Sequence, residues 1–152
     1  MEGEAAPAPR RRLRVGVRPL SPLALKLVAE LLGLRSAEER FAVGVEVVAE
    51  GERLFGCCVL DPHPFFAPLR AELLADCDLC LFAEAASQLR EDSAAELRRE
   101  AQSLRGRKAL LVFGAAGPLR PLLPADFLLA EAEPGAAREA LLGLLRRAES
   151  PR

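Results

Sequence analysis

The chain has 152 residues, of which 51% are hydrophobic, and its 21 basic and 22 acidic side chains leave a net charge of −1 at pH 7. This length predicts one domain that can bury a core, and the balanced charge excludes a strong field that would attract nucleic acid, membranes or acidic substrates. No apolar run approaches the roughly 20 residues that a membrane-spanning helix needs.

The N-terminal stretch MEGEAAPAPRRR has no hydrophobic segment behind its charges, so it is not typical of a signal peptide. We expect residues 1–12 to form a disordered arm. Arg10, Arg11 and Arg12 could contact a phosphate backbone, but beside acidic residues we favour a solubilising role. Four cysteines without a secretory signal favour reduced thiols and an intracellular protein.

The next segment is typical of a strand, a turn and a helix. Residues 14–17 predict a short first strand, with a turn at Gly16 where a phosphate-binding loop would begin. Ser21 is a good N-cap for a helix over residues 22–32, and Gly33 is placed to end that helix.

This first helix is unusually apolar, because its only polar side chains are Lys26 and Glu30, one turn apart. A surface helix usually has a broader polar face. We expect it to pack under the sheet and against the C-terminal helix. The alternative is that a partner protein covers part of its apolar surface, including Leu25 and Ala29.

Residues 41–60 predict a β-hairpin. Three valines at positions 43, 45 and 47 alternate with Gly44 and Glu46, which is typical of a strand with one buried face. The run over residues 54–60 is apolar on both faces and predicts a central strand. A connection over residues 49–52 that contains glycine favours a hairpin turn.

The rest of the chain alternates between strands and helices. A capping box at Ser93 and Glu96 predicts the start of a helix whose apolar stripe is Leu97, Ala101 and Leu104. The remaining elements are a short helix near residues 69–75, strands at 79–83, 108–113 and 127–130, and a C-terminal helix after Pro134 with Ala137, Leu141, Leu144, Leu145 and Ala148 inward.

The order of these elements predicts an α/β fold. Residues 13–149 are expected to form a single Ras-like domain, with a mainly parallel sheet, one antiparallel edge hairpin and helices on both faces. An edge hairpin after the first helix separates the Ras-like plan from a plain doubly wound sheet.

In element order the chain resembles the small GTPases over residues 13–148. Asp61 falls where that family has the metal-linked Asp after its third strand. The stretches DCDLCLFAEA and ALLVFGAAG look like its fourth and fifth strands. The resemblance implies a nucleotide site at the strand ends, so its motifs can be compared position by position.

All three nucleotide-binding motifs of that family depart from the pattern here. In the phosphate loop G-x-x-x-x-G-K-S/T, counted from Gly16, the second Gly is Ser21 and the Lys is Pro22. The D-x-x-G motif is Asp61-Pro62-His63-Pro64. The guanine-reading N-K-x-D is replaced by GAAG at residues 114–117. We therefore expect a pseudo-GTPase with no nucleotide, no metal or other cofactor, and no catalysis.

Among Ras-like proteins without nucleotide, the chain resembles the centromere protein M family of the inner kinetochore. The resemblance lies in residues 78–117, DLCLFAEAASQLREDSAAELRREAQSLRGRKALLVFGAAG, and in the helix LALKLVAELL. It implies a subunit of a stable complex with centromere proteins H, I and K in the nucleus. Without it, we expect a cytoplasmic protein.

Two other functions remain open. The first is a small α/β enzyme, or a nucleotide- or metal-dependent regulator, with a site at the strand ends near Asp61, His63 and Glu84. The second is a pseudo-Rab that acts as a trafficking adaptor. For His63, we favour a solvated or loop-bracing side chain over a catalytic one.

The four cysteines could be read as a redox pair or as two halves of a zinc site, Cys57-Cys58 and Cys77-x-x-Cys80. Adjacent strand residues point to opposite faces, so Cys57 and Cys58 should not bind one metal together. We favour buried thiols that act as small hydrophobic residues.

A pair of phenylalanines follows the third predicted strand. Phe65, Phe66 and Leu69 should lie near the strand-end rim that a nucleotide would otherwise fill. Exposed aromatic pairs tend to mark interfaces. We therefore expect a partner-binding patch there, with Leu25 and Ala29 of the first helix as the next candidates.

Overall fold

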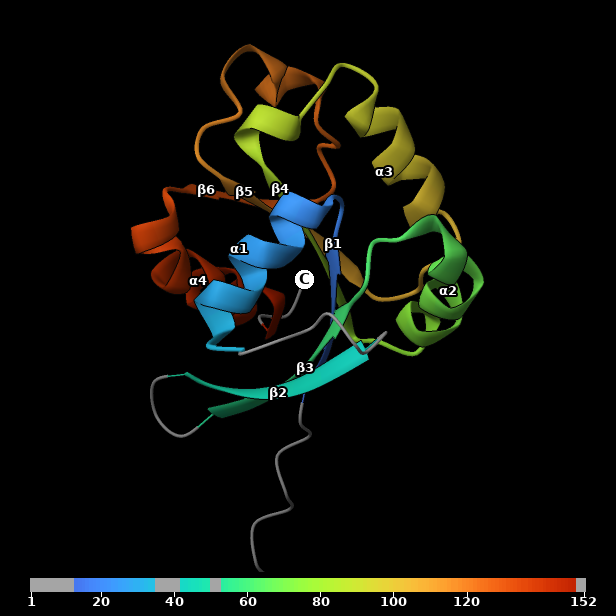
Figure 1. Ribbon diagram of the computed structural model, residues 1–152, viewed down its shortest axis with the longest axis vertical. Coiled ribbons are helices and arrows are strands. Elements are labelled where there is room, and N and C mark those ends of the chain that lie inside the picture. The colour runs from blue at the N-terminus through green and yellow to red at the C-terminus, as the bar shows by residue number, and fades with distance from the viewer. Residues whose placement is uncertain (1–12, 35–41, 50–52, 150–152) are drawn as a thin grey trace, which may run out of the picture.

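The computed structural model describes residues 13–34, 42–49 and 53–149 (Figure 1). The arm over residues 1–12 and the hairpin connection at 50–52 lie outside the described residues. Strands and helices alternate along the chain in the order β1 (Leu13–Pro19), α1 (Pro22–Leu32), β2 (Ala42–Ala49), β3 (Arg53–Leu60), α2 (Ala67–Ala75), β4 (Leu79–Ala85), α3 (Ser93–Ala101), β5 (Arg107–Phe113), β6 (Leu128–Ala132) and α4 (Ala137–Glu149). Short 3-10 turns include η1 (Pro64–Phe66) before α2 and η4 (Pro134–Ala136) before α4.

The strands form one sheet in the order β2-β3-β1-β4-β5-β6. Five of them, β3, β1, β4, β5 and β6, run parallel to one another, which confirms the predicted mainly parallel sheet. β2 pairs antiparallel with β3 at the edge, with Ala42 opposite Leu60. Parallel neighbours need crossover connections, which explains why helices separate the parallel strands along the chain.

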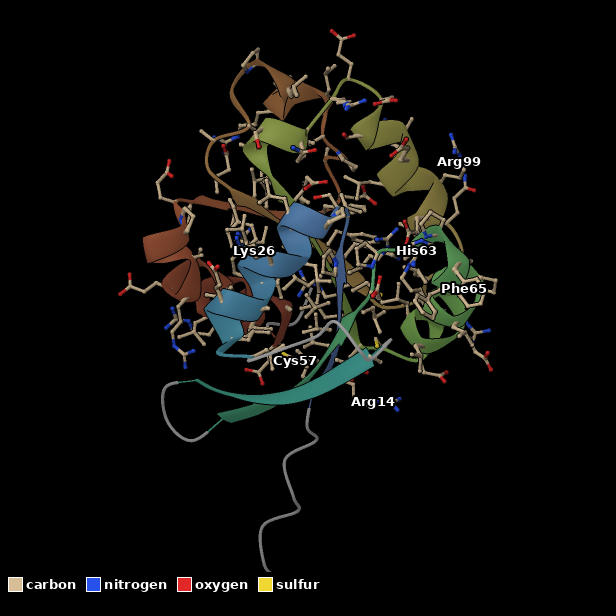
Figure 2. The ribbon with its side chains drawn as sticks, viewed as in Figure 1. Arg14, Lys26, Cys57, His63, Phe65 and Arg99 are labelled. Atoms are coloured by element: carbon tan, nitrogen blue, oxygen red, sulfur yellow. The ribbon has the colours of Figure 1, made fainter. Side chains whose placement is uncertain are left out.

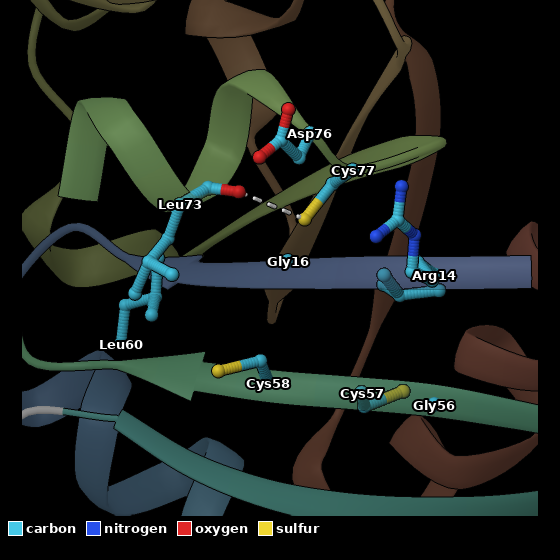
Figure 3. Close-up of a pocket in the computed structure, with 10 residues that line it drawn as sticks. Arg14, Gly16, Gly56, Cys57, Cys58, Leu60, Leu73, Asp76 and Cys77 are labelled. Carbon is cyan, nitrogen blue, oxygen red and sulfur yellow. Dashed lines mark hydrogen bonds between the residues drawn. The ribbon is translucent and has the colours of Figure 1, made fainter.

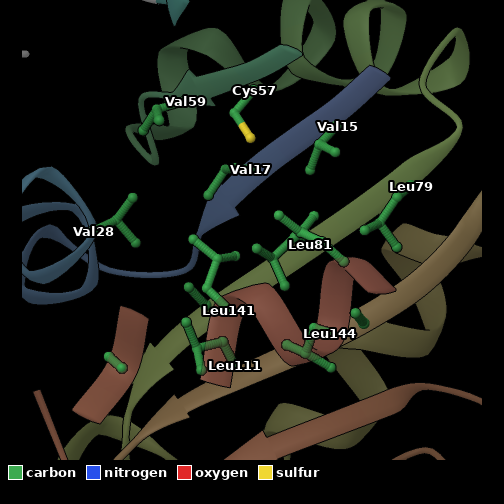
Figure 4. Close-up of a cluster of buried hydrophobic side chains, with 14 of the residues drawn as sticks. Val15, Val17, Val28, Cys57, Val59, Leu79, Leu81, Leu111, Leu141 and Leu144 are labelled. Atoms are coloured by element: carbon green, nitrogen blue, oxygen red, sulfur yellow. The ribbon is translucent and has the colours of Figure 1, made fainter. Parts of the chain in front are cut away.

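Helices cover both faces of the sheet. α1 and α4 lie on one face, and α2 and α3 lie on the other (Figure 1). Because successive strand side chains point to opposite faces, β3, β4, β5 and β6 each contribute to both cores. The core under α1 and α4, shown in Figure 4, includes Val15, Val17, Val28, Cys57, Val59, Leu79, Leu81, Leu111, Leu141 and Leu144. The core under α2 and α3 includes Leu60, Leu74, Cys80, Phe82, Leu97, Leu110 and Val112.

The first helix begins and ends as predicted. Ser21 Oγ accepts a hydrogen bond from the Ala24 N–H at 3.1 Å, and Gly33 takes a φ of 71° that suits a residue without a side chain. α1 contacts β1, β4 and α4, so the predicted packing against the sheet and the C-terminal helix is confirmed. Leu25 and Ala29 are half-buried.

The turn predicted at Gly16 is wrong. Gly16 lies inside β1, where it is in register with Cys58 of β3 and Cys80 of β4. A Cβ at this position would lie 2.5 Å from Leu74 Cδ2 and 2.9 Å from Cys77 Sγ. The glycine therefore permits the close approach of the end of α2 to the sheet, and it does not form a phosphate-binding turn.

The capping box predicted at Ser93 is also wrong. Ser93 is the first residue of α3, and its Oγ accepts a hydrogen bond from the Arg90 N–H at 2.9 Å. The hydroxyl therefore closes the turn before the helix and does not cap it. Leu97 and Ala101 are buried as predicted, and Leu104 is buried just beyond the end of the helix.

Among the described residues, no helix is both long and apolar enough to cross a membrane.

Candidate functional site

The carboxyl ends of the parallel strands are the natural place for a ligand in this fold. In doubly wound sheets ligands bind outside these ends, and phosphates bind to the N–H groups at the start of the following helix. Here only Leu20 and Ser21 separate β1 from α1. The Leu20 N–H donates to the Ala83 carbonyl of β4 at 2.9 Å, which holds this short link against the sheet.

The start of α1 has few N–H groups left for a phosphate. Pro22, at the first helical position, has no N–H. The Ala24 N–H donates to Ser21 Oγ at 3.1 Å, and the Leu25 N–H donates to the Ser21 carbonyl at 3.0 Å. The Leu25 bond is the first regular bond of the helix, so of the free donors at this helix start Pro22 lacks one and the chain's own Ser21 hydroxyl occupies that of Ala24.

A buried carboxylate stands beside this helix end. Glu84, near the end of β4, is only 5% exposed, and its Oε1 accepts a hydrogen bond from Ser21 Oγ at 2.6 Å. The same oxygen accepts from the Ala85 N–H at 2.9 Å. Negative charge is favoured near a helix N-terminus, because the peptide dipoles leave that end partly positive. Glu84 therefore supplies the anion that this end of α1 attracts.

The loop after β5, where the guanine-reading motif would lie, also turns its N–H groups to the chain itself. The Gly114 N–H donates to the Ala132 carbonyl at 2.8 Å, and the Ala116 N–H donates to Glu131 Oε2 at 2.8 Å. Glu131 Oε1 also pairs with Arg120 Nη1 at 3.2 Å. The carboxylate of Glu131 thus binds both the loop backbone, at Ala116, and the Arg120 side chain.

Asp61 and His63 lie close together, but each side chain bonds to a backbone N–H group and not to the other side chain. Asp61 Oδ1 accepts the His63 N–H at 2.8 Å, and His63 Nδ1 accepts the Phe65 N–H at 3.1 Å. The imidazole also meets Phe66 edge-on, with ring centroids 6.3 Å apart. Among the described residues, no hydrogen bond joins either side chain to Glu84. This arrangement braces the loop after β3.

Arg70 of α2 ties the helix to that loop, and sequence analysis missed it. Its Nη1 donates to the carbonyls of Asp61 at 2.8 Å and His63 at 2.7 Å. The side chain is only 5% exposed, and its Nε has no hydrogen-bond partner among the described residues. Burial and the nearby Arg18 lower the pKa of Arg70, while Glu100, which pairs with Arg18 at 2.8 Å, opposes that effect.

The predicted partner patch lies largely on the surface. Phe65, labelled in Figure 2, is 75% exposed and Leu69 is 47% exposed, whereas Phe66 is half-buried. The two phenylalanine rings pack edge-to-face with centroids 5.2 Å apart. Leu73, which the sequence analysis did not single out, is 42% exposed one turn beyond Leu69. Leu25 and Ala29 lie on α1, which packs on the face of the sheet opposite to α2 (Figure 1), so they do not belong to this patch.

The cysteines are held as thiols. Cys57 and Cys58 point to opposite faces of β3, as predicted. Burial raises the pKa of Cys57 and of Cys80 to about 12, and it raises the pKa of Cys77 as well. The Cys77 thiol donates to the Leu73 carbonyl at 3.4 Å, and no cluster of three metal-binding side chains forms within the described part of the chain. A protonated thiol is a poor nucleophile and a poor metal ligand.

A groove opens beside the end of α2, over the face of β1 and β3 (Figure 3). Its volume is about 430 Å³. The walls are mostly apolar, with Arg14 and Asp76 as the charged residues, and the other lining groups include Gly16, Gly56, Cys58, Leu60, Leu73 and Cys77.

No protein-family model matches the chain, and no curated protein matches its sequence.

Proposed function

We propose that the chain is a non-catalytic Ras-like protein, a pseudo-GTPase, that acts as a protein-interaction subunit of a larger complex. The strand order β2-β3-β1-β4-β5-β6, with β2 antiparallel to β3, supports the Ras-like plan over a plain doubly wound sheet. The departures in all three nucleotide-binding motifs support the loss of nucleotide.

The observation that carries this proposal is the contact between Ser21 and Glu84. In a nucleotide-binding protein, the start of the helix after the first strand holds the phosphates. In this chain Ser21 Oγ caps that helix and donates to the buried Glu84 carboxylate at 2.6 Å. A phosphate placed there would meet a carboxylate of like charge. The arrangement therefore disfavours nucleotide, whatever the neighbouring loops do.

The inner kinetochore is the complex that the sequence resemblance favours. The segment that resembles centromere protein M, residues 78–117, contains β4, α3 and β5. On this proposal the partners are centromere proteins H, I and K, and the protein acts in the nucleus. Affinity purification of the full chain with identification of the bound proteins separates this assignment from a trafficking adaptor.

We expect no binding of GTP or ATP tighter than about 10 µM, which corresponds to about −7 kcal/mol, with or without Mg²⁺. Pro22→Lys should not restore binding, because Glu84 and the loop after β5 are unchanged by that substitution. Titration of a fluorescent GTP analogue and the nucleotide content after gentle purification measure this. Tighter binding by the natural chain would overturn the proposal.

We expect Phe65→Ala combined with Phe66→Ala to remove the bound partner while lowering the melting temperature only slightly. Phe65 is exposed and Phe66 is half-buried, so their truncation removes little core packing. Aromatic anchors at an interface commonly cost about 2 kcal/mol or more when cut to Ala. Affinity purification measures the bound partner, and thermal unfolding of the same variant measures its melting temperature.

The matched control is Leu122→Ala, which truncates another exposed apolar side chain, 46% exposed, outside α2. This variant should keep both the partner and the melting temperature. A large fall in the melting temperature of the Phe65→Ala, Phe66→Ala double variant would show that the two rings stabilise the fold. The partner interface would then lie elsewhere on the protein, and α1 would be the next candidate.

A further inference from the structure

The second helix buries one charged side chain, Arg70, and leaves two leucines exposed. Arg70 and Leu74 are the buried residues of α2, whereas Leu69 and Leu73 are 47% and 42% exposed. A helix that lies on a core normally does the reverse. Long exposed aliphatic side chains on one helix indicate that something apolar covers them.

The two exposed leucines form one row. Residues four apart in a helix lie on the same face, about 6 Å apart, so Leu69 and Leu73 are neighbours. Phe65, in the turn η1 just before the helix, is exposed as well. Leu73 also forms a wall of the groove over β1 and β3. We call the surface made by Phe65, Leu69, Leu73 and this groove the α2 ledge.

The ledge lies beside a part of the sheet that the domain's own helices leave open. The groove reaches down to Gly16 of β1 and to Gly56 and Cys58 of β3 (Figure 3). On the opposite face, α1 and α4 cover the same strands. Parallel strands are ordinarily covered by helices on both faces, so the element that fits next to α2 is another helix.

The charges on the ledge select the kind of helix. Glu72 of α2 and Asp76, the residue that follows α2, are exposed on this surface, and Arg14 of β1 is the one basic residue among those that line the groove. The positions three and four residues from Glu72 on α2 are Pro68, Leu69, Ala75 and Asp76, so none of them is basic. A partner helix with basic residues on the side that faces Glu72 and Asp76 would be electrostatically complementary to this surface.

A second copy of this chain does not supply such a helix. The apolar faces of α1, α3 and α4 are buried in the domain's own cores, at residues such as Val28, Leu97 and Leu144. A face already packed on its own sheet cannot also form the seam of another molecule's groove. The exposed face of a second α2 carries the same acidic residues, Glu72 and Asp76, so the described helices favour a partner helix from a different protein.

We propose that the α2 ledge binds an amphipathic α-helix of a partner protein, with an aliphatic seam against Phe65, Leu69 and Leu73 and basic side chains toward Glu72 and Asp76. This inference rests on the proposed function as an interaction subunit, and it specifies how the partner is held. It is the helix-in-groove mode of recognition, in which apolar side chains at three- and four-residue spacing anchor the helix.

The test uses the full chain and a synthetic probe. The probe is a fluorescein-labelled peptide of about 18 residues, long enough to form a helix on binding, with leucines every three or four positions and lysines elsewhere. A matched peptide has glutamate in place of each lysine. Fluorescence anisotropy measures the dissociation constant of each peptide with each variant.

We expect the lysine peptide to bind at micromolar concentration and the glutamate peptide to bind more weakly. Leu69→Ala combined with Leu73→Ala should weaken binding of the lysine peptide about tenfold or more. Glu72→Lys should weaken the lysine peptide and strengthen the glutamate peptide. Leu122→Ala, outside the ledge, should change neither, and circular dichroism should show every variant folded.

Absence of binding by the lysine peptide, or equal binding by the natural chain and the leucine double variant, would overturn the ledge proposal. So would a dimer of the free chain in sedimentation that the leucine double variant dissolves, because a second copy would then occupy the surface. The lysine peptide could fail to bind while the Phe65→Ala, Phe66→Ala double variant still loses the cellular partner. That result would keep the proposed function as an interaction subunit and reject only binding of a helix at the ledge.

Discussion

Gly106→Ala is expected to lower the free energy of unfolding by about 3 kcal/mol, the upper part of the range for overpacked sites. A Cβ at Gly106 would lie 2.4 Å from the Cys77 carbonyl oxygen and 2.7 Å from that of Asp78. Both are backbone atoms, so no side-chain rotation relieves the clash. The Arg107 N–H donates to the Asp78 carbonyl at 3.0 Å, so a shift there also strains the start of the β4–β5 pairing.

The control for this substitution is Gly143→Ala in α4. A Cβ at Gly143 meets nothing within 4 Å, and the glycine lies in the interior of a helix. Alanine there should raise the free energy of unfolding by about 0.5 to 1 kcal/mol, because it restricts the unfolded chain and favours helix. Urea unfolding measures both variants. Similar values for the two would show that residues 77 and 78 can move away from a side chain at position 106.

Glu84→Ala is expected to cost about 3 kcal/mol of unfolding free energy. The carboxylate accepts two hydrogen bonds, from Ser21 Oγ at 2.6 Å and from the Ala85 N–H at 2.9 Å, and it is nearly fully buried. Hydrogen bonds to charged groups contribute about 1.5 to 3 kcal/mol each, and a buried donor left without its partner adds a desolvation penalty. Glu84→Gln keeps a carbonyl acceptor and should cost less.

Ser21→Ala tests whether the two residues act as one unit. Alone it should cost about 1 to 2 kcal/mol through the lost N-cap and the lost bond to Glu84. In the double variant the costs should fall short of the sum by about 1 kcal/mol, because the shared bond is counted in both single variants. Urea unfolding of the four proteins gives this coupling. Strict additivity would mean that the hydroxyl and the carboxylate stabilise the chain independently.

The fold could be predicted where a local pattern decides the structure. Ser21 and Gly33 bound α1 as expected, because capping depends on a few backbone groups next to the residue itself. The apolar runs of β4 and β5 became buried parallel strands, since no other element of this fold buries both faces. Those features need no knowledge of distant residues.

The site depended on contacts between distant segments and could be predicted only in part. Gly16 was taken for a turn because nothing near it in sequence reveals that Leu74 and Cys77 pack onto it. Glu84 was named only as a candidate in an enzyme-like site, since its bond to Ser21 joins residues 63 positions apart. The exposure of Phe65 and Leu69 fitted the expectation, whereas hydropathy alone would have turned Leu73 inward and Arg70 outward.

The contact between Ser21 and Glu84 has a consequence for how the molecule responds to its surroundings. A dissociable ligand stabilises a protein in proportion to the logarithm of its free concentration, so dilution or competition removes the effect. A carboxylate on the neighbouring strand is present at a fixed effective concentration that no cellular pool changes. The start of α1 is therefore held in one state without a ligand, and on the function proposed above its partners would meet a constant surface, with no cycle of loading and release.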